Sequence, residues 1–93
     1  MIDLKYNAAK IVWTLQYLNN KHGKKLLQSE LEAIVRKDPE HWLYNISGYG
    51  IALYLDEAVR RGWLKLVDRP GTDEVGYAVK TSMSVIERLL DKT

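Results

Sequence analysis

The segment between residues 46 and 80 constrains the fold most, because a helix pattern, a helix stop and two strand patterns follow one another there without interruption. Four apolar residues recur at the spacing of one face of an amphipathic helix: Ile51, Leu55, Ala58 and Val59. Gly62 comes next, at the position where a helix favours a left-handed C-terminal cap. Residues 63–67 and 75–80 are rich in strand formers, and the turn residues 69–73 separate them. This segment therefore predicts a helix that leads directly into a β-hairpin.

The residues before this segment predict two further helices. Asp3 is suited to cap a first helix that extends to about Asn19. That helix has an apolar stripe to bury, formed by Leu4, Ala8, Ile11, Leu15 and Leu18. Ser29 and Glu32 have the spacing of a capping box, which opens a second helix that ends at about Arg36.

Short elements complete the expected order. Residues 24–27 can form a short extended segment between the first two helices. Residues 38–44 begin with Asp-Pro, which predicts a short turn of helix before the third helix, and Asn45 or Ser47 caps that third helix. After the hairpin, Thr81, Ser82 and Ser84 offer caps for a last helix with a wide apolar arc, and residues 84–87 again have the spacing of a capping box.

The composition indicates one small globular domain over residues 1–93, since 46% of the residues are apolar and 28% are charged. No apolar run is long enough to span a membrane, and the N-terminus lacks the apolar core of a signal peptide. The absence of cysteine excludes disulfides and fits an intracellular, cytoplasmic protein. The net charge is only +2, which is a weaker basic footprint than most nucleic-acid binders have.

Three short motifs carry a family resemblance: Gln28-Ser29-Glu30-Leu31, Ala58-x-x-x-Gly62-Trp63-Leu64 and Tyr77-x-Val79-x-Thr81-x-x-Ser84. They resemble the second helix, the end of the third helix and the second wing strand of MarR- and PadR-type winged helix-turn-helix regulators. The chain is also similar in size to the small winged-helix regulators of archaeal viruses and phages, which is consistent with a viral or mobile-element origin. The resemblance implies an α+β winged helix-turn-helix fold, with a three-helix core, a β-hairpin wing and a C-terminal helix.

The resemblance also implies a surface for double-stranded DNA. The third helix, about residues 47–61, is expected in the major groove, and the wing, about residues 68–75, on the backbone or in the minor groove. Three polar side chains are expected near base edges: Asn45, Ser47 and Tyr49. Phosphate contacts are expected from Lys24, Lys25, Ser29 and either Arg36 or Lys37, and one wing contact from Arg69. These residues predict a sequence-specific DNA-binding transcriptional regulator.

A second side of the first helix carries aromatic residues where a helix covered on one side only would be polar. Tyr6, Trp13 and Tyr17 share that side. Either the C-terminal helix of the same chain covers them or a second subunit does. A domain of this size has little surface with which to bury both sides of a helix, so we expect a homodimer in which Val85 and Leu89 of the last helix also take part. Two linked subunits would also strengthen DNA binding.

The same sequence also allows two functions other than DNA recognition. A winged-helix module that binds proteins and not DNA is the main alternative, because the wing has one basic residue among three acidic ones. A small-molecule effector is a further alternative, with an apolar pocket lined by Trp13, Tyr17, Trp42 and Tyr44. His22 and His41 have no partner at metal-ligand spacing. We therefore expect no enzymatic activity, no metal and no cofactor.

Overall fold

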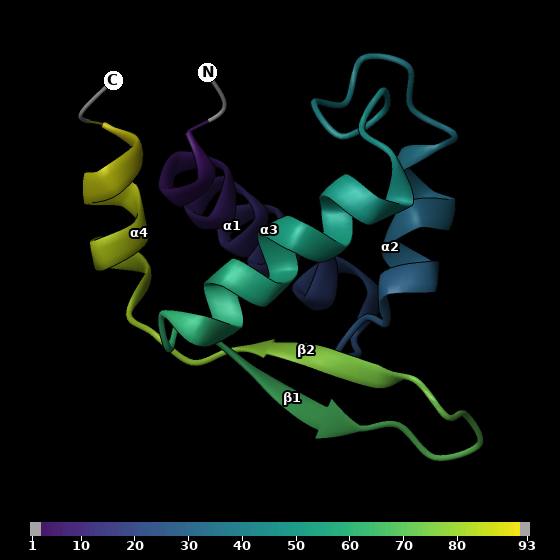
Figure 1. Ribbon diagram of the computed structural model, residues 1–93. Helices are drawn as coiled ribbons and strands as arrows, with labels where there is room; N and C mark the ends of the chain where they lie inside the picture. The colour runs from purple at the N-terminus through teal and green to yellow at the C-terminus, as the bar shows by residue number, and fades with distance from the viewer. Residues whose placement is uncertain (1–2, 92–93) are drawn as a thin grey trace.

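The computed structural model describes residues 3–91, which form a small α+β fold with four helices and one two-stranded antiparallel hairpin (Figure 1). In chain order the elements are α1 (Leu4–His22), α2 (Gln28–Val35), α3 (Gly48–Arg60), β1 (Leu64–Asp68), β2 (Val75–Val79) and α4 (Met83–Leu90). The strands pair from Leu64 with Val79 to Asp68 with Val75. This layout is compatible with the expected winged helix.

The core lies where α1 and α3 cross. α4 packs against α1, α2 lies beside α3, and the hairpin lies below the helices and contacts α1 through β2 (Figure 1). The side chains that are fully buried include Ile11, Leu15, Leu31, Ile51, Leu55 and Ile86. The apolar stripes predicted for the first and third helices therefore do supply the core.

α1 begins as expected, because the Asp3 side chain accepts a hydrogen bond of 2.9 Å from the Tyr6 backbone N–H. It ends one turn later than expected, at His22, where Gly23 takes a left-handed conformation with φ of 67°. Asn19 was expected near the end of the helix but is a buried residue within it.

Asn19 joins three parts of the chain. Its amide nitrogen donates to the Tyr77 carbonyl at 2.9 Å, and its amide oxygen accepts from the Leu26 N–H at 2.9 Å. Next to this junction, Leu27 forms an isolated antiparallel bridge with Gly76, so the short extended segment expected at residues 24–27 is present at its last residue. A Cβ atom at Gly76 would lie 2.6 Å from the Lys25 carbonyl oxygen, so the backbones approach too closely for any side chain there.

α2 begins two residues earlier than the capping-box prediction placed it, because its N-cap is Leu27 and not Ser29. The N–H of Leu27 donates to the Glu30 carboxylate at 2.9 Å, so Glu30 closes the first turn in place of Glu32. Glu32 instead accepts a hydrogen bond of 3.1 Å from the Gln28 side chain. The predicted pairing of Ser29 with Glu32 is therefore wrong.

The short helix expected at residues 38–44 is also wrong, because this stretch forms a succession of turns. The Asp38 carboxylate does accept from the Glu40 N–H at 3.2 Å, as a cap would. Beyond it the chain is held by Arg36, whose guanidinium donates to the carbonyl oxygens of Leu43, Tyr44 and Ile46. These carbonyls satisfy their hydrogen-bonding needs through a side chain and so do not require a helix.

The later elements follow the sequence more closely. Ser47 caps α3 by accepting from the Gly50 N–H at 3.1 Å, and Gly62 takes the left-handed conformation with φ of 78°. α4 is capped by Ser82, one of the three residues expected to do so, which accepts from the Ser84 N–H at 3.3 Å, and not by the box that starts at Ser84. Within residues 3–91, no helix combines the length and apolar character needed to cross a membrane.

Candidate nucleic-acid interface

α3 exposes one side along its whole length. Because Ile51, Leu55 and Ala58 face the core, the opposite side is open to solvent: Tyr49, Leu53, Asp56 and Arg60. Tyr49 is 84% exposed, the highest value among the large apolar side chains described. The structure thus places Asn45, Ser47 and Tyr49 together at the exposed beginning of α3. Leu53 was not expected on this side, although its spacing from Tyr49 could have indicated it.

The beginning of α3 is held in place by α2. The Gln28 side chain donates to the Gly48 carbonyl at 2.8 Å. A Cβ atom at Gly48 would lie 2.8 Å from a carboxylate oxygen of Glu32, so the glycine allows the two helices to approach closely. The exposed residues at the beginning of α3 therefore stand on a fixed support rather than on a free loop.

Arg69, which was expected to extend from the hairpin turn, folds back against α2. Its guanidinium donates to the two carboxylate oxygens of Glu30 at 2.7 and 3.0 Å, and to the Lys25 carbonyl oxygen at 2.7 Å. This bidentate geometry is the strong form of an arginine–carboxylate pair. The charge of Arg69 is therefore neutralised by a neighbour within the chain.

Two other predicted phosphate contacts also have acidic partners. The Lys24 ammonium lies 2.9 Å from Glu30. The Ser29 hydroxyl donates to Glu74 at 2.7 Å, and the Ser29 N–H lies 3.4 Å from the same carboxylate. Glu74 thus occupies the place at the N-terminus of α2 where an anion would bind. The Lys25 side chain makes no ion pair or hydrogen bond with residues 3–91.

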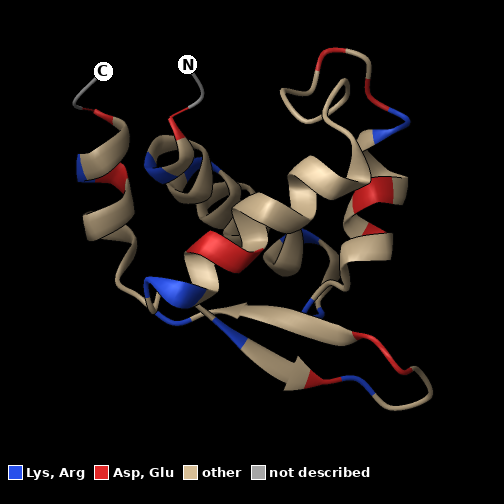
Figure 2. Cartoon of the chain, viewed as in Figure 1, with Lys and Arg blue, Asp and Glu red and all other residues tan. Residues whose placement is uncertain are grey.

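These pairings shape the electrostatics of the hairpin. Hydrogen bonding from Arg69 is the main influence that holds the pKa of the Glu30 carboxyl well below its usual range. Hydrogen bonds from the Leu27 N–H and from Lys24 lower this pKa further, whereas desolvation of the carboxyl raises it. Figure 2 shows acidic residues on both sides of the hairpin turn, and these are Asp68, Asp73 and Glu74. The turn is therefore an acidic end of the molecule.

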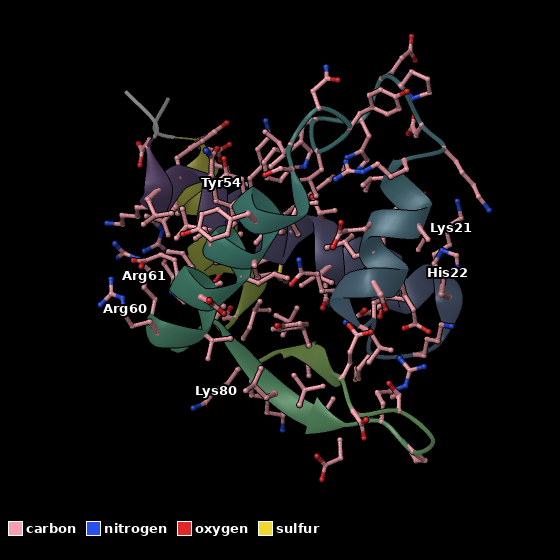
Figure 3. All side chains as sticks on the ribbon, turned by 45° about the vertical axis from the view of Figure 1, so that its right-hand side comes forward. Lys21, His22, Tyr54, Arg60, Arg61 and Lys80 are labelled. Carbon is pink, nitrogen blue, oxygen red and sulfur yellow. The ribbon has the colours of Figure 1, made fainter. Side chains whose placement is uncertain are left out.

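The opposite end of the hairpin is basic, which the sequence analysis did not identify. Figure 3 shows Arg60 and Arg61 at the end of α3 and Lys80 below them, where the hairpin begins and ends. Lys65 lies in β1, and the Lys80 N–H donates to the carbonyl of Trp63 at 2.9 Å. The available signal was that Lys65 follows Arg60 and Arg61 closely in the chain, and that the hairpin pairing returns Lys80 to the same end.

One acidic residue is shared by the two arginines of this basic end. Glu57 accepts from Arg60 through two nitrogens and from Arg61 Nε at 2.6 Å. The pKa of Glu57 is lowered, mainly by the hydrogen bonds from Arg60 and further by the one from Arg61. Burial acts in the opposite direction but is weaker than the hydrogen bonding from Arg60. The Arg61 guanidinium also lies 5.5 Å from the ring centre of Trp63. Two arginines and one glutamate leave the basic end with a net positive charge.

The predicted dimer residues divide into two groups. Trp13 and Tyr17 are 49% and 57% exposed, and Val85 is exposed on α4. Tyr6 and Leu89 are half-buried.

The turns of residues 38–46 cover part of the aromatic side of α1, an arrangement that neither sequence alternative included. Trp42 Nε1 donates to Thr14 Oγ1 at 3.0 Å, and its ring stacks on Tyr54 at a centroid distance of 6.1 Å. The Lys10 ammonium lies 4.7 Å from the Trp42 ring centre. The covered part therefore lies around Lys10 and Thr14, whereas Trp13 and Tyr17 stay open.

The exposed beginning of α3 offers an amide, a hydroxyl and a phenol, which are groups that bind base edges and phosphates. The basic end of the hairpin lies at the opposite end of α3 (Figure 3), and Lys25 stands in the segment before α2. Among residues 3–91, no three His, Asp or Glu side chains are grouped so that they could hold a metal ion. The chain matches no protein-family model, no curated protein and no solved structure.

Proposed function

We propose that this chain is a winged helix-turn-helix protein that binds double-stranded DNA as a homodimer and regulates transcription. In this proposal α2 and α3 are the helix-turn-helix, and the hairpin is the wing. The observation that carries the proposal is the open side of α3, whose first turn presents Tyr49 at 84% exposure on a support formed by α2. A helix that enters the major groove needs such an uncovered first turn.

Sequence readout is assigned to the beginning of α3. An asparagine such as Asn45 can bond an adenine through two hydrogen bonds, and a serine such as Ser47 can bond a base or a phosphate. Tyr49 can donate to a phosphate or lie against a thymine methyl group. Because no arginine lies at this position to read guanine, the proposed preference is for A·T-rich sites, supported by DNA shape.

Backbone contacts are assigned to the cations that flank α3. Lys25 is free to contact phosphate, and the basic end of the hairpin supplies Lys65 and Lys80. Lys24 and Arg69 join them only when phosphate replaces Glu30 as their partner. A few phosphate contacts per subunit give weak binding at physiological salt, on the order of 10⁻⁴ to 10⁻⁶ M for non-specific sites.

Dimerisation compensates for this weakness, because the second subunit then binds at a high effective concentration. The proposed dimer surface contains the exposed rings of Trp13 and Tyr17 together with Val85. Tyr6 and Leu89 contribute at its edge. A two-fold dimer of this kind would recognise a palindromic site.

A protein-binding module is the second candidate function, and the Glu30–Arg69 pair favours it. A wing whose arginine is already neutralised attracts phosphate weakly, whereas the exposed Tyr49 and Leu53 side chains suit a protein partner. Retention on heparin at about 50 mM salt separates the two functions. A DNA-binding protein is retained, and a protein-binding module flows through.

The decisive experiment is selection of bound duplexes from a random pool, carried out with the wild type, Tyr49→Ala and Glu87→Gln. The proposal expects a palindrome to be enriched by the wild type and by Glu87→Gln, whose substitution lies on α4 away from the interface. Tyr49→Ala should lose this enrichment while its thermal stability stays unchanged, because the Tyr49 side chain is exposed. If the wild type enriches no sequence, the proposed regulator is ruled out.

A further inference from the structure

A cavity of about 530 Å³ opens between α1 and the turns of residues 38–42. This volume lies within the range of roughly 300–1,000 Å³ that is usual for small-ligand sites. Its apolar surface comes from three aromatic rings, those of Trp13, Tyr17 and Trp42, with Leu18 and Ile34 beside them. Trp42 is fixed by its hydrogen bond to Thr14 and by stacking on Tyr54, so one wall is rigid.

Charged groups of opposite sign line the two sides of this cavity. Lys10 and Lys21 come from α1, and Asp38 and Glu40 come from the turns opposite. None of the four side chains forms an ion pair with another residue in the range 3–91. Lys21, Asp38 and Glu40 are exposed, so solvent balances their charges in the free protein and a ligand that carries both signs can replace that solvent.

The positions of the two lysines are fixed by aromatic contacts. The Lys10 ammonium lies 4.7 Å from the ring centre of Trp42, and the Lys21 ammonium lies 5.9 Å from that of Tyr17. His41 lies within electrostatic reach of both Lys10 and Asp38, whose charges act on it in opposite directions. Burial lowers the pKa of His41, so the imidazole adds no charge at neutral pH.

We propose that this cavity binds a small aromatic zwitterion, of the chemical class of a free aromatic amino acid. The ring of the ligand packs against the rings of Trp13, Tyr17 and Trp42 that line the cavity, since aromatic rings favour offset-stacked and edge-to-face contacts. The ligand carboxylate binds the ammonium groups of α1, and the ligand ammonium binds the carboxylates of the turns. The proposal goes beyond DNA binding and does not depend on it. Because the ligand uses the rings of Trp13 and Tyr17, it competes with the second subunit for that part of the proposed dimer surface.

Four probes test the proposal by isothermal titration of the full-length protein. L-Phenylalanine carries all three recognised features, 3-phenylpropanoate lacks the ammonium, phenethylamine lacks the carboxylate, and L-alanine lacks the ring. We expect L-phenylalanine to bind at least about tenfold more tightly than each of the others, because a hydrogen bond between charged groups is worth about 1.5–3 kcal/mol. Equal binding of 3-phenylpropanoate or phenethylamine would overturn the zwitterion assignment, as would no saturable binding of L-phenylalanine.

Charge-specific variants locate the site. Removing a lysine charge with Lys10→Gln or Lys21→Gln should weaken L-phenylalanine about tenfold but leave phenethylamine unchanged. Removing an acid with Asp38→Asn or Glu40→Gln should weaken L-phenylalanine but leave 3-phenylpropanoate unchanged. Lys5→Gln, an exposed change on the same helix away from the cavity, is the matched control. If neither lysine variant or neither acid variant weakens L-phenylalanine while each stays folded by circular dichroism, the proposal fails.

Discussion

Arg69 and Glu30, which are 39 residues apart in the sequence, face each other through two hydrogen bonds of 2.7 and 3.0 Å. The pair ties the hairpin turn to the first turn of α2. It also takes one cation, and with Lys24 a second, out of the charge available to a phosphate backbone. Glu30 thus stabilises the position of the wing and lowers the attraction of the surface for nucleic acid.

Replacing Glu30 with glutamine should strengthen DNA binding. Arg69 and Lys24 lose their carboxylate partner and become available to phosphates, and each new phosphate contact adds about 0.9 to the slope of log K against log salt. We therefore expect higher affinity at low salt and a slope steeper by about one to two, measured by fluorescence anisotropy with a labelled duplex.

Glu87→Gln is the control for this prediction, because it removes the same charge from α4. The control should raise affinity less than Glu30→Gln, with a smaller change in slope. Equal effects of the two variants would show that only net charge matters and that the pairing of Arg69 with Glu30 does not restrain binding.

The same pair gives a dependence of stability on pH. The pKa of Glu30 is lower in the folded chain than its ordinary value of 4.5, chiefly through hydrogen bonding from Arg69. A carboxyl group with a lowered pKa stabilises the fold above its unfolded pKa, and this stabilisation is lost as the pH falls below that value. Urea unfolding should therefore show Glu30→Gln losing stability relative to the wild type at pH 7, with the difference shrinking progressively below pH about 4.5. A difference that stays constant across this range would contradict the assignment.

Asn19 should contribute strongly to stability because its amide satisfies two buried backbone groups. Asn19→Ala leaves the Leu26 N–H and the Tyr77 carbonyl without this partner. We expect the free energy of unfolding to fall by about 2–6 kcal/mol, at roughly 1–3 kcal/mol for each of the two unsatisfied groups. The neighbouring Asn20 is exposed, so Asn20→Ala should change stability by less than about 0.5 kcal/mol. Similar losses in both variants, measured in urea, would argue against the junction.

The proposed dimer can be tested on α4. Val85 is exposed, so Val85→Asp should leave the folded subunit intact and place a charge within the proposed apolar interface. Sedimentation velocity over a range of concentrations should show the wild type associating and Val85→Asp remaining monomeric. Ser84→Asp adds the same charge at the next exposed residue and should still associate. A wild type that stays monomeric at all concentrations would remove the dimer from the proposal.

The elements that the sequence predicted well are those whose signals are local. The stripe Ile51, Leu55 and Ala58 is repeated within one helix, and Gly62 ends that helix through its own backbone conformation. The antiparallel hairpin likewise follows from two strand-forming runs on either side of a Pro-Gly turn. Each of these elements is determined by residues close together in the chain, so the sequence pattern alone is enough to predict it.

The elements that it missed depend on contacts between distant segments. Glu30 and Glu32 both stand near the start of α2, and Arg69, which lies far along the chain, helps hold Glu30 in place at the cap. The turns after Asp38 remain non-helical because Arg36 satisfies their carbonyl groups.

The candidate site follows the same division. The exposure of Tyr49 could be deduced from the helix period, and that of Ser47 from its role as the cap before the helix. The neutral pairing of Arg69 could not, because its partner lies on another element.

The tight approach of Gly76 to the Lys25 carbonyl, beside the amide of Asn19, has a consequence for ancestry. Surface charges can drift freely among descendants of one gene, but a position with no room for a Cβ atom cannot. Relatives too diverged to resemble this chain elsewhere should still keep an asparagine in the last turns of the first helix and a glycine in the second strand. Asn19 and Gly76 are therefore the two positions at which we expect distant relatives to agree with this chain.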